Sequence, residues 1–281
     1  QAEYINPFFP YLGYQAGNRS AMDSFGLFMR YMNDEYKPLP SSIIAEGIDC
    51  FGVAGDRGDV AMVGYGAARY ALASGNCNEA EKLWPLIEWC LEYCHRQLNV
   101  DGVVKSDSDE LENRFPAGKA NLCTSSLYYD ALVSAAYLGK ALKKEHKQIK
   151  SYQDRAAELY KNIDVYFARN VEGYDTYRYY DGNTVLRSWI CIPLTMGIYD
   201  QAKGTVEALF SDKLWMENGL LTQSGTSTYW DRSTLYAFRG AYSCGARDIA
   251  TEFGGRGDEV HMYPLSFSEF MSCYDGNKYD G

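Results

Sequence analysis

The run of residues 59–74 reads Asp-Val-Ala-Met-Val-Gly-Tyr-Gly-Ala-Ala-Arg-Tyr-Ala-Leu-Ala-Ser and is almost free of charge. Small and apolar side chains on all sides of a helix predict that other elements pack around most of it. Residues 78–97 instead place apolar side chains at helical spacing with charges between them, which predicts an amphipathic helix. Because Gly75 and Asn76 separate the two segments, we expect a hairpin of one inner and one outer helix.

The same pair of helices recurs further along the chain. Residues 124–142 are again rich in Ala, Ser and Gly, and residues 152–167 are again amphipathic. This alternation predicts an all-α fold, a toroid or an incomplete toroid of helical hairpins, with short extended segments in its loops. Further helices are expected at 20–36, 189–199, 205–210 and 229–244, a loop at 41–58 and short extended pieces within 174–186.

Local signals mark two of these helix boundaries. Ser20 to Asp23 resembles a capping box and predicts that a helix begins there. Pro85 is compatible with the first turns of the helix at 78–97.

We expect one domain over residues 1–253, with an irregular segment at 254–281 that belongs to it. About four or five hairpins fit into this length, so part of a six-hairpin toroid is shortened or supplied elsewhere.

Composition narrows the classes of partner. The net charge of −10 argues against a nucleic-acid partner, and the chain contains no apolar run long enough to span a membrane. Aromatic residues make up 15% of the chain, with 25 Tyr, which suits the apolar faces and hydroxyls of sugars but equally a Tyr-rich core. Cys90 and Cys94 stand one helical turn apart without a second ligand pair, which favours buried free thiols over zinc. Composition alone favours a Tyr-rich core over a sugar-binding surface.

The helices predicted at 59–74 and 124–142 are called lean here, because their side chains are mostly small and apolar. Charged residues gather where the lean helix at 59–74 begins. Asp56, Arg57 and Asp59 stand at the N-terminal end of this helix, and Asp49 precedes them in the sequence. Neighbouring carboxylates raise one another's pKa and an Arg lowers it, so such a group can supply an acid that keeps its proton. Either Asp is equally suited to cap the helix. The pattern leaves a catalytic site and a structural cap open.

A second acidic cluster lies between the outer helix and the next inner helix. Asp107, Asp109, Glu110 and Glu112 fall within six residues, and Arg114 follows. The EF-hand calcium pattern fails because Leu111 stands where a ligand is needed. The alternatives are a solvated acidic loop and part of a binding face, and the position of the loop in a toroid favours the binding face.

Two later clusters combine aromatic and charged residues. Residues 175–183 contain Tyr177 and Arg178 and lead to Trp189; they fit a sugar-contact surface or a β-hairpin that turns at Asp181-Gly182-Asn183. Trp230, Asp231 and Arg232 stand at the start of a predicted helix, where they could form a stacking wall or a cap with an ion pair.

Over residues 15–250 the chain resembles the six-hairpin glycosidase superfamily, the (α/α)6 toroids. The resemblance is carried by Gly58-Asp59, Leu83 to Trp89, Glu112-Asn113-Arg114-Phe115-Pro116 and Trp230-Asp231-Arg232-Ser233. Asp49-Cys50 and Gly58-Asp59 loosely match the frame of the acid loop in the α-L-rhamnosidase-like branch. The Glu that this branch places between them is absent, and Asp56 is the carboxylate left in that interval.

The resemblance implies a glycoside hydrolase of the inverting, two-carboxylate type, with a carbohydrate substrate as its partner and with no metal or organic cofactor. Asp56 is then the candidate acid, and Glu110, Glu112 or Glu269 the candidate base. The candidate substrate-binding residues are Asp49, Arg57, Asp59, Arg114, Tyr177, Arg178, Trp189, Trp230, Asp231 and Arg232. A non-catalytic glycan-binding or interaction toroid is the main alternative, and a polysaccharide lyase is a further one.

Overall fold

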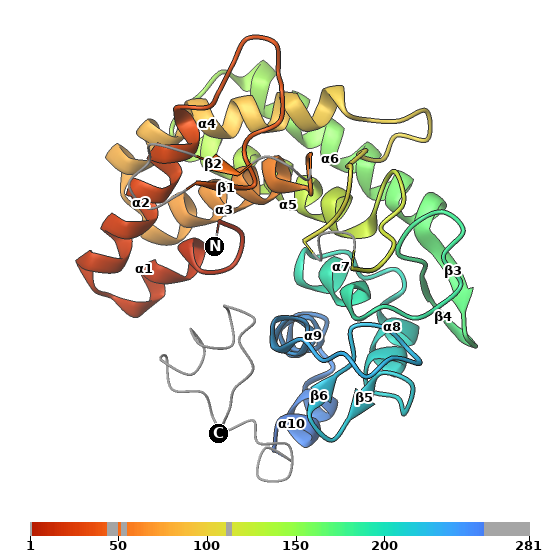
Figure 1. Ribbon diagram of the computed structural model, residues 1–281. Helices are drawn as coiled ribbons and strands as arrows, with labels where there is room; N and C mark the ends of the chain where they lie inside the picture. The colour runs from red at the N-terminus through yellow and green to blue at the C-terminus, as the bar shows by residue number, and fades with distance from the viewer. Residues whose placement is uncertain (1, 44–49, 52–54, 111–113, 256–281) are drawn as a thin grey trace. The chain divides into compact units, whose positions relative to one another are not determined.

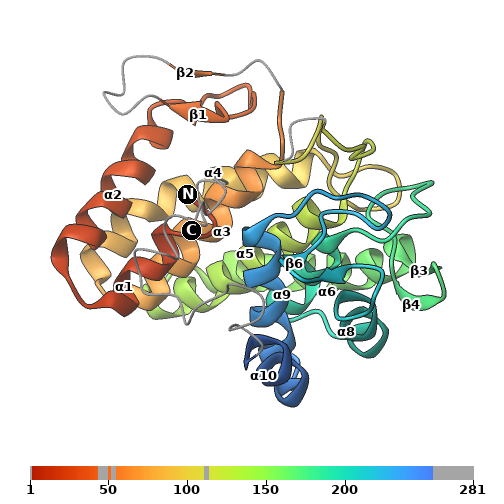
Figure 2. The ribbon, with the colours of Figure 1, turned by 60° about the horizontal axis from the view of Figure 1, so that its bottom comes forward.

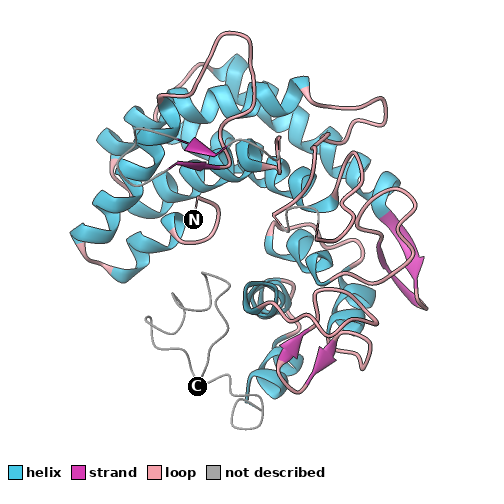
Figure 3. Cartoon of the chain, in the orientation of Figure 1, coloured by secondary structure: helices cyan, strands magenta, loops and turns pink. Residues whose placement is uncertain are grey.

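The computed structural model describes residues 2–43, 50–51, 55–110 and 114–255. The chain divides into two compact units, unit 1 over residues 1–166 and unit 2 over residues 167–281. Most of the described residues that have regular secondary structure are helical (Figure 3). The strands among the described residues form three two-stranded antiparallel sheets. The mainly helical class predicted from the sequence is confirmed. A single domain over residues 1–253 and closure of the hairpins into a toroid stay predictions.

Unit 1 begins with η1 (Asn6–Phe8), α1 (Phe9–Leu12) and α2 (Gln15–Met29). The expected helix at 20–36 was placed about six residues too late. The resemblance of Ser20 to Asp23 to a capping box is misleading, because these residues lie inside α2. Beyond α2 the side chain of Asn33 accepts the N–H of Lys37 at 2.8 Å, and Tyr36 has a φ of 51°, which a continuing helix does not allow.

The centre of unit 1 is the predicted pair of helical hairpins, α3 (Asp59–Ser74) with α4 (Cys77–Arg96) and α5 (Leu122–Ala141) with α6 (His146–Phe167). α3 packs against both α4 and α5 (Figure 1, Figure 2). Burial extends along nearly all of α3 and α5, whereas α4 and α6 each keep an exposed polar face. The distinction between lean inner helices and charged outer helices is therefore confirmed in this unit.

Side chains from α4 and α6 connect the two outer helices. The rings of Trp84 and Tyr152 have centroids 6.3 Å apart, and Arg155 lies 3.6 Å from Glu92. α6 begins six residues before the predicted start at 152, because Gln148 and Ile149 donate backbone hydrogen bonds to the Glu145 carbonyl. His146, Lys147 and Gln148 at its start are polar, although Ile149 is buried and continues the apolar period of the helix.

Asparagine side chains begin two of the helices of unit 1. The Asn76 side chain accepts the N–H groups of Asn78 and Glu79 at the start of α4.

The expectation for Pro85 was wrong: it lies in the interior of α4, where it removes a helical hydrogen-bond donor. The predicted loop at 41–58 contains a short pairing of β1 (Ser42–Ile43) with β2 (Cys50–Phe51).

A glycine allows close packing between α3 and the segment that precedes α1. A Cβ added at Gly66 would lie 1.8 Å from the carbonyl oxygen of Ala2. The backbone at Ala2 therefore rests directly on α3, and Glu3 beside it is only 3% exposed. This contact excludes any side chain at residue 66.

Unit 2 joins short helices to short hairpins. Its first elements are β3 (Ala168–Val171), β4 (Tyr174–Tyr177), η2 (Ser188–Ile190), α7 (Cys191–Thr195) and α8 (Ala202–Leu209). They are followed by β5 (Trp215–Met216), β6 (Gly219–Leu220), α9 (Asp231–Ser243) and α10 (Arg247–Gly255). α7 and α10 both pack against α9, and α8 packs against β4. The half-buried rings of Phe210, Trp215, Phe238 and Phe253 form an aromatic cluster between β5, α9 and α10, with centroids 5.0–5.9 Å apart.

Two predictions for unit 2 need correction. The β3–β4 hairpin turns at Glu172 and Gly173, which have φ values of 51° and 97°, and not at Asp181-Gly182-Asn183. The helix expected at 189–199 is split into η2 and α7 and ends at Thr195, before Gly197 with its φ of 82°. No helix among the described residues is long and apolar enough to cross a bilayer.

Candidate functional site

The side chain of Asp56 closes the N-terminal end of α3. Its Oδ1 accepts the backbone N–H groups of Gly58 at 2.8 Å and Asp59 at 3.0 Å. Its Oδ2 accepts the hydroxyl of Tyr93, from α4, at 2.8 Å. Asp56 is 4% exposed, so this carboxyl group lies inside unit 1 and makes defined contacts through both oxygens.

Asp59 forms a second buried carboxyl group one turn away. Its Oδ1 lies 3.2 Å from Nη2 of Arg57, and its Oδ2 accepts the backbone N–H of Arg57 at 3.2 Å. The guanidinium of Arg57 also donates to the carbonyl of Ser41 at 3.0 Å. Arg57 therefore balances the charge of Asp59 and ties the start of α3 to the chain before β1.

The acidic loop after α4 packs directly against Asp56. The backbone N–H of Asp56 donates to Oδ2 of Asp107 at 2.7 Å, and the Asp56 carbonyl accepts the N–H of Asp107 at 2.7 Å. Nδ2 of Asn121 donates to the carbonyl of Ser108 at 3.3 Å and holds the other side of the loop. Asp107 is thus the link between the two acidic segments that the sequence singled out.

Gly58 allows the close approach of α5 to this corner. It has a φ of 87°, and an added Cβ would lie 2.5 Å from Oγ1 of Thr124 in the first turn of α5. Asn121 in turn accepts the N–H of Thr124 at 2.9 Å and caps α5. The N-terminal ends of two inner helices therefore meet at Asp56.

Burial controls the protonation of this cluster. It raises the pKa of Asp56 to about 6, with a further contribution from the charge of Asp59, while the hydrogen bonds from Tyr93, Gly58 and Asp59 oppose the rise. Burial also raises the pKa of Asp59, against the lowering effect of Arg57. Asp56 can therefore exchange a proton near neutral pH, which general acid–base chemistry requires.

The predicted residues of unit 1 are only partly brought together. Asp56, Arg57 and Asp59 form one cluster, and Glu110 belongs to the loop that packs on Asp56. Arg114 is exposed. Asp49, Glu112 and Glu269 lie outside the described residues.

Sequence reasoning missed Tyr93 and Asn121 as members of the site. Tyr93 lies on the buried face of α4, three residues after Cys90 and in register with it. A polar hydroxyl on that apolar face was the available signal, because a buried Tyr usually needs a partner for its hydroxyl. Asn121 directly precedes an apolar helix, which is typical of an N-cap.

A cluster in unit 2 joins two of the predicted tryptophans. The rings of Trp189 and Trp230 have centroids 4.8 Å apart, and Tyr236 lies edge-on to Trp189 at 5.6 Å. The guanidinium of Arg232 lies 4.8 Å from the centroid of the Trp230 ring. Trp189 is 1% exposed, whereas Trp230 and Arg232 are half-buried. Trp230 and Arg232 are therefore the solvent-accessible part of this cluster.

The remaining predicted residues of unit 2 have different surroundings. Arg178 pairs with Asp181, and its backbone N–H donates to Phe167, so it belongs to the hairpin region. Tyr177 is 1% exposed at the end of β4. Asp231 is half-buried as the first residue of α9. Arg187, which is outside the predicted set, is 1% exposed, and its guanidinium lies 4.6 Å from the Tyr179 ring centroid.

The described part of the chain offers no ligand set for a metal. No group of three or more His, Cys, Asp or Glu residues there has the arrangement to hold a metal ion. Cys90 and Cys94 are buried and form no disulfide, and burial raises the pKa of both.

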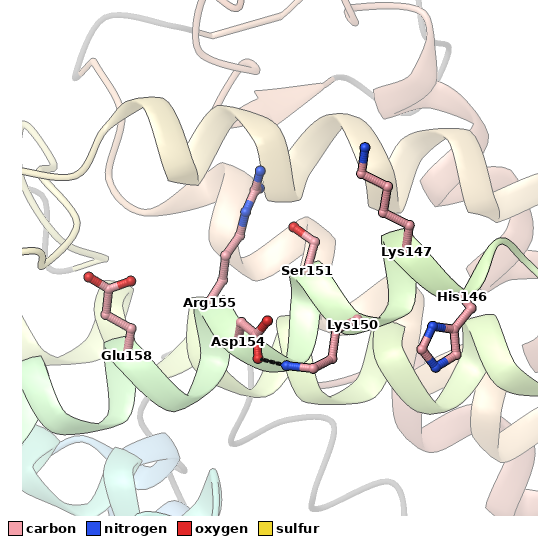
Figure 4. Close-up of a pocket in the computed structure, with 7 residues that line it drawn as sticks. All are labelled: His146, Lys147, Lys150, Ser151, Asp154, Arg155 and Glu158. Atoms are coloured by element: carbon pink, nitrogen blue, oxygen red, sulfur yellow. Dashed lines mark hydrogen bonds and ion pairs between the residues drawn. The ribbon is translucent and has the colours of Figure 1, made fainter.

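Surface depressions of unit 1 also lie away from the carboxyl cluster. One groove of about 560 Å³ lies along α6 and is lined by His146, Lys147, Lys150, Ser151, Asp154, Arg155 and Glu158. Figure 4 shows these side chains along the helix, with Lys150 paired to Asp154. The groove is open and its residues all come from one helix, so the buried carboxyl cluster remains the better candidate for chemistry.

Comparison with known proteins identifies a fold relationship. No protein-family model and no curated protein sequence matches the chain. A rhamnosidase from Klebsiella oxytoca, solved with rhamnose bound, superposes with a TM-score of 0.64 at 13% identity over 92% of this chain. An uncharacterised conserved protein from Thermus thermophilus superposes with a TM-score of 0.65 at 13% identity, over 91% of this chain and 82% of that one.

A family GH78 rhamnosidase from Bacillus sp. GL1 has a TM-score of 0.54 at 13% identity over 73% of this chain. The chain spans 49% of the Klebsiella protein and 22% of the Bacillus protein. The similarity therefore shows that this chain has a fold found in glycosidases, and that it corresponds to only part of these larger enzymes.

Proposed function

We propose that the chain is a glycoside hydrolase, or the toroid part of one, and that Asp56 is its general acid. The observation that carries this proposal is a carboxyl group that is 4% exposed and has a pKa raised to about 6. Such a group keeps its proton in weakly acidic solution and can give it to the oxygen of a leaving sugar. A fold like that of rhamnosidases supports this choice of reaction.

In the proposed inverting mechanism a second carboxylate activates water on the opposite side of the sugar ring. The two carboxyl groups of inverting enzymes lie about 6.5–9.5 Å apart, which leaves room for that water. Glu110 is the candidate base among the described residues, and Glu112 and Glu269 are candidates outside them. In this mechanism Asp56 gives a proton to the leaving oxygen, and the base takes a proton from the attacking water. Neither step requires a metal or an organic cofactor.

Sugar binding is assigned to aromatic and charged side chains. Trp230 can stack on the apolar face of a sugar ring, and Arg232 and Asp231 can hydrogen-bond to its hydroxyls. The other residues proposed to bind the sugar are Asp49, Arg57, Asp59, Arg114 and Arg178. Tyr177 and Trp189 are each 1% exposed, so they are not assigned direct contact with the sugar. Because the Klebsiella structure contains rhamnose, an α-L-rhamnoside is the first substrate to test.

A glycan-binding domain without catalysis is the second candidate. It is favoured by the role of Asp56 as a cap, since both of its carboxyl oxygens accept hydrogen bonds from the protein. A purely structural Asp56 would leave the domain able to bind sugar but unable to cleave it.

The test is release of sugar from a panel of aryl glycosides and oligosaccharides that includes α-L-rhamnosides. We expect hydrolysis by the wild-type chain and a loss of about a hundredfold or more in kcat for Asp56→Asn. Asp154→Asn is the matched control, because Asp154 is exposed and pairs with Lys150 at the surface. NMR of the first product distinguishes inversion from retention.

Three outcomes decide between the candidates. Sugar binding without turnover supports the glycan-binding domain. Full activity in Asp56→Asn removes Asp56 as the acid. Formation of an unsaturated uronate product would identify a lyase and contradict the hydrolase.

A further inference from the structure

Tyr93 bonds to one oxygen of the buried Asp56 carboxyl group. Tyr93 is 2% exposed, and its hydroxyl lies 2.8 Å from Oδ2 of Asp56. The other oxygen, Oδ1, already accepts two backbone N–H groups, from Gly58 and Asp59. A proton on Oδ1 would point at these donors, so the neutral form of Asp56 must carry its proton on Oδ2.

The hydroxyl of Tyr93 can serve both forms of the carboxyl group. It donates to Oδ2 when Asp56 is ionised, and it accepts from the carboxyl O–H when Asp56 is protonated. Burial, together with the charge of Asp56, raises the pKa of Tyr93, so this phenol stays neutral while Asp56 titrates. The exchange therefore needs only rotation of one hydroxyl hydrogen.

A stack of rings holds Tyr93 in place. Tyr93 stacks on Trp89 with centroids 5.7 Å apart and an interplanar angle of 21°. Trp89 stacks in turn on Tyr36 at 5.4 Å and 10°, and its indole N–H donates to the carbonyl of Asn33 at 2.9 Å. The guanidinium of Arg96 lies 3.9 Å from the centroid of the Tyr36 ring and closes the stack. The loop after α2 thus fixes the position of a hydroxyl inside unit 1.

We propose that Tyr93 is a positioning residue that places the transferable proton of Asp56 on Oδ2 and stabilises the carboxylate once the proton has left. The role in proton delivery rests on the proposed glycosidase function. The assignment of the proton to Oδ2 rests only on the hydrogen bonds of the folded chain.

Tyr93→Phe tests this assignment, because it removes the hydroxyl and keeps the ring in the stack. Carbon-13 NMR of labelled Asp carboxyl groups, assigned with Asp56→Asn, follows the titration of Asp56 directly. Wild-type Asp56 is expected to titrate near pH 6. In Tyr93→Phe the midpoint should rise by about one pH unit, because the ionised form loses a donor. Tyr36→Phe, which changes a hydroxyl at the far end of the stack, should leave the midpoint in place.

The pH–rate profile provides the second measurement. A general acid works only while protonated, so the alkaline limb of kcat/KM should move upward with the NMR midpoint in Tyr93→Phe. Trp89→Leu, which keeps the hydroxyl but removes the ring beneath it, should give a smaller rise. An unchanged Asp56 midpoint in Tyr93→Phe would overturn the role of Tyr93, whether or not the protein hydrolyses sugars. A raised midpoint supports it, even if absence of turnover in the wild type refutes the glycosidase.

Discussion

The carboxylate of Asp56 accepts the backbone N–H of Asp59 at 3.0 Å, and the charge of Asp59 raises the pKa of that same carboxylate. One contact therefore caps α3 and brings two acidic groups together. The sequence left a catalytic site and a structural cap open: Asp56 caps α3 and has a raised pKa, and its catalytic use stays a proposal. This double role links stability to pH.

Asp56 should make the folded chain less stable as the pH rises. Its pKa is about 6 in the folded chain and 3.8 without the protein environment, so the folded state binds the proton more tightly. Stability is then lost as the pH rises from about 4 to 6, by about 3 kcal/mol at about 1.4 kcal/mol per pH unit. Asp56→Asn should reduce this loss, because an amide keeps an acceptor for the cap and carries no charge. Urea unfolding at intervals between pH 4 and 7 measures it; equal losses in both proteins would contradict the prediction.

Gly58→Ala should destabilise unit 1 by about 2–3 kcal/mol. The added Cβ would combine an unfavourable φ of 87° with a 2.5 Å contact to Thr124. Gly75→Ala is the matched control at the other end of α3, since its φ is 61° and the described residues leave space within 4 Å. Thermal unfolding should show a larger drop for Gly58→Ala than for Gly75→Ala. Addition of Thr124→Ala should restore part of the difference, and equal effects at the two glycines would rule out the contact.

Gly66→Ala should displace the segment that rests on α3. The added methyl would meet the backbone carbonyl of Ala2 at 1.8 Å, and a backbone atom cannot move aside as a flexible side chain can. We expect a loss of about 2 kcal/mol or more. Gly26→Ala in α2, where the described residues leave open space, should instead gain about 0.5–1 kcal/mol from helix propensity. Urea unfolding of both variants checks the opposite signs.

Trp189 and Trp230 should separate stability from sugar binding. Trp189 is 1% exposed, so Trp189→Ala should destabilise unit 2 by about 3–5 kcal/mol. Trp230 is half-buried, so Trp230→Ala should cost less stability but weaken binding of the best sugar about tenfold or more. Calorimetric titration with that sugar and thermal unfolding measure the two effects. Unchanged affinity in Trp230→Ala would remove Trp230 from the sugar site.

Much of unit 1 could be predicted because its helices follow local rules. Gly75 and Asn76 stand where α3 ends and α4 begins, and the helix predicted at 59–74 matches the residues of α3. The start of α2 was missed because Ser20 to Asp23 resembles a cap without acting as one, and tertiary packing starts the helix earlier. The start of α6 was missed because His146, Lys147 and Gln148 are polar, although Ile149 continues the apolar period of the helix.

The sequence predicted some of the residues of the candidate site, but not which of them contact one another. The sequence itself places Asp56, Asp59 and the acidic loop near the starts of the helices at 59–74 and 124–142, where unpaired backbone N–H groups favour carboxylates. The bond between Asp56 and Tyr93 joins residues 37 positions apart, and the link to Asp107 spans 51 positions. Spacing along the chain carries no information about such pairs.

The sequence by itself determined which helices are lean and which are charged, since helical period and side-chain size are local properties. It also determined that carboxyl groups gather at the ends of the lean helices. Only the tertiary structure decided that Asp56 is buried, that its Oδ1 caps α3 and that its Oδ2 faces Tyr93. The physical reason is that the pKa and the position of a proton depend on desolvation and on partners from other elements, which meet only when the helices pack.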